Sequence, residues 1–179
     1  YSGFKGLKNQ EDFVNKYMEE KEVFTPKDGC GIEDFELTDK VTLITINSQW
    51  FFEDWNDHPT INDECAIKSR DDFFLELESL IAKNENKTII LSLHHPWLTN
   101  GSHGGQFSLR RSLISTEEHF KVPILGALYG LLRKTSGISD QDALNKGYNN
   151  LSRRIRAMIQ SENNIVVVSG HEHSLEYIE

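Results

Sequence analysis

Two apolar runs of strand length, each ending at a histidine, constrain this chain more than any other feature. Residues 87–93 (KTIILSL) lead into His94, and residues 164–169 (NIVVVS) lead into Gly170 and His171. Continuous apolar runs of this length are typical of strands that are buried on both faces of a sheet. Each run comes after a helical pattern, so the sequence predicts an α/β core.

The two predicted helices differ in the strength of their signals. Ser69 and Asp72 resemble a capping box, and the helix after them is expected to end near Asn84. From Asp140 onward, apolar residues recur at intervals of three and four, which is the strongest helical signal in the chain. The apolar faces are Phe73, Leu77, Leu80 and Ile81 in the first helix, and Leu144, Tyr148, Leu151, Ile155 and Met158 in the second.

The first third of the chain predicts a helix, a hairpin and a loop. Residues 9–20 carry apolar residues at helical spacing, namely Phe13, Val14, Tyr17 and Met18. Residues 34–48 contain two strand patterns separated by the turn residues 38–40, which predicts a hairpin. Residues 49–67 predict a long, irregular but ordered loop whose aromatic side chains cover the edge of the core.

Composition excludes some classes of function. The chain has 179 residues, of which 37% are apolar, and this suits one domain with a real core. A net charge of −9 leaves no basic face for nucleic acid, so we expect no nucleic-acid partner. No segment is long and apolar enough to contact a membrane as a span. An acidic protein can still bind a phosphate ester where metal cations supply the positive charge.

The two cysteines allow two interpretations. Cys30 and Cys65 are too far apart in sequence for a zinc knuckle or a redox CxxC pair, and the simpler expectation is two free, buried thiols. If the protein is exported, the same residues could form a disulfide instead.

Three histidines stand at the carboxyl ends of the two apolar strands, where ligands gather in α/β sheets. In the segment His171-Glu172-His173, an extended backbone would point both imidazoles to the same side. The pair, together with His94, could then face one metal or two adjacent metals. Gly170 would let the backbone turn closely beside them.

These segments resemble a known family. LSLHHPW, the NGSHGGQ directly after it, and VVVSGHEHSLEYI are similar to the last blocks of the calcineurin-like metallophosphoesterases, especially those near the purple acid phosphatases. The resemblance covers residues 1–179, with high specificity only at the two histidine blocks. It implies the C-terminal part of a layered αββα sandwich, and a single metallophosphoesterase domain of which residues 1–179 are that part.

The resemblance also implies site residues. By position, His94 matches the lone strand-end ligand, while His171 and His173 match the two ligands of the GHxH block. In that family His94 and His171 hold one metal, and His173 holds the other. Histidine and carboxylate ligands suit zinc, manganese or iron, so the resemblance implies two such ions as cofactors.

Two further histidines are candidates for catalysis. His103, in a glycine-rich loop, resembles a substrate-side histidine that would hydrogen-bond a phosphoryl oxygen or protonate the leaving group. His95 is a weaker catalytic candidate, because its position holds non-ligand residues in relatives. We expect His95 to support the ligands or to pack beside them.

The family's earlier blocks, DxH, GDxxD and GNH(D/E), have no counterpart here. Acid pairs such as Asp71 with Asp72, or Asp54 with Asp57, lack the strand-end context and are interpreted as solvated surface acids. The opening residues 1–3 resemble the residues directly after the GNHDW block in relatives, and the chain stops within the last strand. We therefore expect the missing N-terminal part of the same domain to complete the site.

The implied activity is hydrolysis of phosphate mono- or diesters by a hydroxide that two metals activate. The isolated fragment is then expected to be inactive. The alternatives are a non-catalytic phosphoesterase-like module that binds a partner, and a single structural zinc on the three histidines. Relatives near the purple acid phosphatases are often exported, so a cell-envelope or extracellular location is expected.

Overall fold

The computed structural model describes residues 3–18, 23–99, 145–171 and 175–178. The chain divides into two compact units. The first consists of Tyr1–His94 with Ala157–Ser169, and the second consists of His95–Arg156 with Gly170–Glu179. The sheet belongs to the first unit, and most of helix α6 (Lys146–Ile159) belongs to the second.

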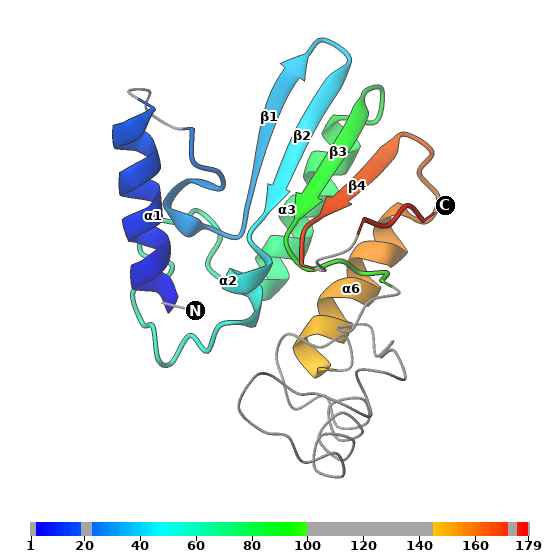
Figure 1. Ribbon diagram of the computed structural model, residues 1–179. Coiled ribbons are helices and arrows are strands. Elements are labelled where there is room, and N and C mark those ends of the chain that lie inside the picture. Colours follow the sequence, from blue (N-terminus) through cyan, green and yellow to red (C-terminus); the bar gives the residue numbers. More distant parts are fainter. Residues whose placement is uncertain (1–2, 19–22, 100–144, 172–174, 179) are drawn as a thin grey trace, which may run out of the picture. The chain divides into compact units, whose positions relative to one another are not determined.

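The first unit is built on a mixed sheet of four strands in the order β1-β2-β3-β4 (Figure 1). β1 and β2 form an antiparallel hairpin, while β3 pairs parallel to β2 and β4 pairs parallel to β3. The predicted α/β class, the hairpin and the two neighbouring strands are thus confirmed. The strands are β1 (Ile32–Thr38), β2 (Val41–Ile46), β3 (Thr88–Leu93) and β4 (Ile165–Ser169).

Helix α3 (Arg70–Lys83) provides the crossover that two parallel strands require, and it lies behind the sheet in Figure 1. Its start is the predicted cap, because the Ser69 hydroxyl accepts a hydrogen bond from the Asp72 amide at 3.0 Å. Its end is also as predicted. Asn84 caps it, and the Asn84 side chain, buried, accepts a hydrogen bond from the Thr42 hydroxyl of β2.

The core of the first unit lies between α3 and the sheet. All four residues of the predicted α3 face are buried, and Phe74 is buried beside them. The predicted irregular loop was partly wrong, because its first residues form helix α2 (Ser48–Phe52), which Asn47 caps by accepting from the Trp50 amide. The sheet and α2 contribute Ile32, Ile44, Ile46, Ile89, Leu91, Leu93, Trp50 and Phe51 to this core.

Arg70 fixes the chain that leaves α2. Its guanidinium donates to the carbonyl oxygens of Phe51 and Glu53, each at 2.7 Å, and lies 4.3 Å from the ring centroid of Trp55. Burial lowers the pKa of Arg70, and the nearby carboxylate of Asp54 opposes that shift. One side chain therefore satisfies two loop carbonyls and stacks on a loop aromatic.

The first predicted helix is confirmed, although its bounds differ from the expected residues 9–20. Helix α1 (Gly3–Tyr17) begins earlier than expected, and Phe13 and Tyr17 are 66% and 76% exposed. The contacts of α1 with the short 3-10 helix η1 (Lys27–Gly29) are largely polar: the Lys8 ammonium and the Asp28 carboxylate lie 2.8 Å apart, and Glu11 accepts from the Asp28 amide. Burial lowers the pKa of Lys8, but the hydrogen bonds and negative charges of Asp28 and Glu11 together outweigh burial, so the pKa of Lys8 is raised.

The two parallel strands differ from the expectation of burial on both faces. In β3, Ile89, Leu91 and Leu93 are buried, whereas Ile90 and Ser92 between them are half-buried. In β4, Val166 and Val168 are 55% and 49% exposed. Within the described residues β4 is an edge strand, and the face that carries Val166 and Val168 is largely uncovered.

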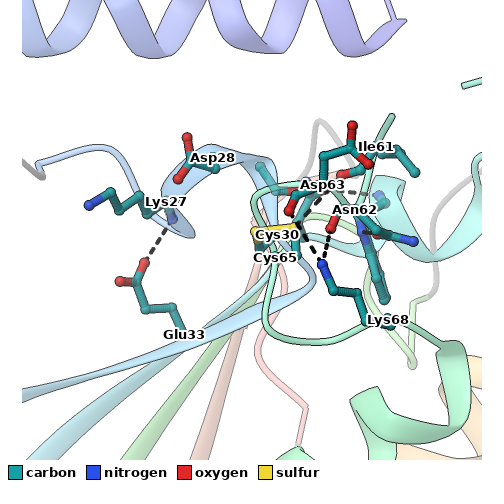
Figure 2. Close-up of a disulfide and its surroundings, with 12 residues drawn as sticks. Lys27, Asp28, Cys30, Glu33, Ile61, Asn62, Asp63, Cys65 and Lys68 are labelled. Carbon is teal, nitrogen blue, oxygen red and sulfur yellow. Dashed lines mark hydrogen bonds between the residues drawn. A yellow bond between two sulfur atoms is a disulfide. The ribbon is translucent and has the colours of Figure 1, made fainter. Parts of the chain in front are cut away.

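Cys30 and Cys65 form a disulfide with a Cα–Cα distance of 5.5 Å, so the expectation of free thiols was wrong (Figure 2). The bridge ties the start of the hairpin to the loop before α3. Beside it, the Lys68 ammonium donates to the carbonyl oxygens of Asn62 and Asp63. Disulfides persist in oxidising compartments, and this is the environment to which the bridge points. Among the described helices, none has the length and apolarity needed to cross a membrane.

Removing the disulfide should destabilise the first unit. The bridge spans 35 residues of sequence, and we expect Cys30→Ser with Cys65→Ser to lower the free energy of unfolding by about 2–4 kcal/mol. Urea unfolding followed by circular dichroism would measure this. A reductant should destabilise the unmodified chain and leave the double variant unchanged. Equal stability of the double variant and the unmodified chain without reductant would contradict the expectation.

Candidate metal centre

The sheet brings the ends of β3 and β4 to one edge. Leu93 of β3 pairs with Ser169 of β4 and also with Ile46 of β2, and these strands all run in the same direction. The next residues along the chain are His94 after β3 and Gly170 after β4. His94 is exposed and ends the first unit. Carboxyl edges of parallel strands are the usual place for ligands in α/β proteins.

In the second unit, two histidines are buried side by side. His95 is 2% exposed and His171 is 7% exposed. Their ring centroids lie 4.5 Å apart with the planes inclined by 43°, and their ligand nitrogens lie within 4.8 Å of one another. His95 comes from the segment after β3 and His171 from the segment after β4, so residues 76 positions apart in sequence meet here.

Helix α6 fixes the segment that carries His95. The ring of Tyr148 meets the His95 ring edge to face, with centroids 5.6 Å apart and planes at 86°. The Tyr148 hydroxyl donates to the Pro96 carbonyl, and the Ser152 hydroxyl donates to the Trp97 carbonyl at 3.3 Å. These residues lie on the buried side of α6, which also carries the predicted apolar residues Leu151 and Ile155.

The donor chemistry of this pair fits a transition metal. A neutral imidazole keeps one nitrogen as an acceptor, and it is the commonest protein ligand for zinc and related ions. Magnesium and calcium prefer oxygen ligands, which this pair does not offer. Two buried imidazoles with nitrogens close together can therefore supply part of a nitrogen-rich metal site.

The structure describes only some of the predicted site residues. His95 and His171 lie together, whereas His103 and His173 lie outside the described residues. The convergence of His94, His171 and His173 therefore stays a prediction. We expected Gly170 to let the backbone turn closely beside the histidines, and within the described residues this was wrong. The φ angle of Gly170 is not positive, and a Cβ added there would meet nothing within 4 Å.

The acid pairs are the surface acids that the sequence predicted. Asp71 and Asp72 are exposed in the first turn of α3, where negative charge is favourable. Asp54 is also exposed, and it accepts hydrogen bonds from both nitrogens of Asn56, while Asp57 is exposed nearby. Within the described residues, none of these acids belongs to a group that could hold a metal.

Sequence reasoning missed the two hydroxyl contacts from α6. Tyr148 was predicted only as part of an apolar helix face, and Ser152 was not singled out. The available signal was chemical: a tyrosine on a buried helix face needs an acceptor for its hydroxyl. The sequence could not name Pro96 as that acceptor, since the two residues are 52 positions apart.

Comparisons with known proteins found no matching family model, no matching curated protein and no matching solved structure.

Proposed function

We propose that this chain is the C-terminal part of a calcineurin-like metallophosphoesterase domain, a layered αββα sandwich that hydrolyses phosphate mono- or diesters. One observation carries the proposal. The parallel register pairs Leu93 with Ser169, so the HHPW segment and the GHEH segment leave neighbouring strands at the same edge of one sheet. A phosphoesterase of this family requires its last two histidine blocks to start at such a place.

The burial of His171 beside another imidazole supports its role as a ligand. We assign His94 and His171 to one metal and His173 to the second, with zinc, manganese or iron as the ions. The remaining ligands, including a bridging carboxylate, would come from the missing N-terminal part of the domain. Exposed His94 is then a ligand whose burial would depend on that part.

When bound, the ions would lower the pKa of the attacking water and neutralise the charge that develops on the ester. The chain's own residues then have separate tasks. His94, His171 and His173 would hold the metal ions, while His103 hydrogen-bonds a phosphoryl oxygen or gives a proton to the leaving oxygen. His95, buried between Tyr148 and His171, is suited to support rather than to direct contact with substrate.

The disulfide supports a finer proposal on location. A bridge between Cys30 and Cys65 needs an oxidising compartment, and we propose the cell envelope or the extracellular space. The acidic net charge of −9 is compatible with a small phosphate-ester substrate at a metal-loaded site, and it disfavours nucleic acid.

The 179-residue chain alone should bind metal weakly or singly and should hydrolyse an aryl phosphate at a rate near background, because the blocks that supply the bridging carboxylate in the family have no counterpart in its sequence. Metal titration followed by a chromogenic phosphatase assay would measure both quantities. The control is the same chain with His171→Ala, which should lose the weak binding. Rapid metal-dependent turnover by the chain alone would show that acids within it complete the site, and absence of any metal binding would favour a partner-binding module.

In the complete domain, His94→Ala and His171→Ala should each remove the same metal, because each withdraws a direct ligand. His103→Ala should keep both metals and lower turnover by about 10²- to 10⁴-fold, the usual contribution of a general acid. Elemental analysis beside kinetics would separate the roles. Full metal content in His94→Ala, or metal loss in His103→Ala, would contradict the assignment.

A further inference from the structure

The segment after β3 is held by α6 at two successive carbonyls. The Tyr148 hydroxyl donates to Pro96, and the Ser152 hydroxyl donates to Trp97. Tyr148 is 2% exposed, so its hydroxyl must find a partner inside the protein or leave a buried donor unsatisfied. The contact with Pro96 satisfies this buried donor.

The ring of Tyr148 also contacts the ring of His95, so the three rings of Tyr148, His95 and His171 are in contact one after another. Tyr148 meets His95 edge to face, and His95 lies against His171 with a centroid distance of 4.5 Å. All three side chains are buried. Since packed rings have few alternative rotamers, the orientation of one ring limits the orientation of the next.

The backbone around His95 strengthens this coupling. A residue before proline is confined to extended conformations, and proline itself has a fixed φ angle. One freedom that remains in the segment is the ψ angle of Pro96, which sets the direction of its carbonyl. The Tyr148 hydroxyl fixes that direction, so one side chain of α6 restrains both the backbone after His95 and the His95 ring.

We propose that Tyr148 is a positioning residue for the metal ligand His171, acting through the ring of His95. The inference rests on the proposed function, because it takes His171 as a ligand. Residues that orient a ligand from behind typically change metal affinity by about 10- to 100-fold when they are removed. Tyr148 does not touch the metal in this arrangement, and His95 supports His171 through the contact between their rings.

Two variants separate the two contacts of α6. Tyr148→Phe removes only the hydroxyl that holds Pro96, and we expect it to weaken Zn²⁺ binding by about 10-fold or more. Ser152→Ala is the matched control, because it removes the neighbouring hydroxyl contact to Trp97 and should leave Zn²⁺ affinity nearly unchanged. Isothermal titration of the 179-residue chain with Zn²⁺ gives the affinities, and urea unfolding checks that the two variants are comparably stable.

Two substitutions at His95 test the line of rings without altering Tyr148. His95→Phe keeps a ring and removes both nitrogens, so Zn²⁺ affinity should stay close to that of the unmodified chain. His95→Ala removes the ring and should weaken binding as Tyr148→Phe does. If His95→Phe loses metal as fully as His171→Ala, then His95 is a ligand itself and the proposed positioning role is overturned.

A measurement without metal distinguishes failure of this inference from failure of the proposed function. In chain labelled at histidine, the rings of His95 and His171 are close enough for a nuclear Overhauser effect, which should persist in Ser152→Ala and weaken in Tyr148→Phe. An unchanged signal in Tyr148→Phe would overturn the positioning role whether or not metal binds. A weakened signal with no Zn²⁺ binding by the unmodified chain would support the positioning of His171 and refute the metal site.

Discussion

Parallel pairing of β3 with both β2 and β4 is the constraint on which the rest of the described structure depends. It requires a crossover on each side, and it places the ends of β3 and β4 at one edge. Asn164 helps to set the register, because its side chain donates to the carbonyl oxygens of Glu85 and Lys87 just before β3. A slip by one residue would turn every side chain of β4 to the opposite face.

The crossover between β2 and β3 needs its own restraints, since much of it is not regular structure. The disulfide of Cys65, the Arg70 guanidinium and the Trp50 indole, which donates to Asn62 at 2.8 Å, hold this segment at three separate places. Each restraint joins the loop to a helix or to the start of the hairpin. Together they let a polar loop of this length stay ordered over an aromatic core.

The sequence predicted the features that are local and periodic. The α3 cap at Ser69 and the strands before His94 and Gly170 followed from local patterns, and the structure confirms them. Of the predicted apolar stripe in α6, Tyr148, Leu151 and Ile155 are buried, while Leu144 lies outside the described residues. Sequence reasoning failed for features that depend on contacts between residues far apart in the chain. The exposed face of β4 depends on which layer covers it, and the disulfide and the Tyr148–Pro96 contact depend on residues 35 and 52 positions apart. Of the candidate site, the sequence placed His94 and His171 just after the correct strands, but it could not predict the ring contact between His95 and His171.

Burying the imidazoles of His95 and His171 has a free-energy cost that the protein must offset. Moving polar groups out of water costs free energy, and apolar side chains of similar shape would fill the same space without that cost. Two buried imidazoles in contact therefore need polar partners, which hydrogen bonds or a bound metal would supply. The same reasoning explains a tyrosine in α6 where phenylalanine would fill the core, because only tyrosine can also hold the Pro96 carbonyl. Whether a nitrogen of His171 binds a metal therefore distinguishes the proposed phosphoesterase from a module that binds a partner.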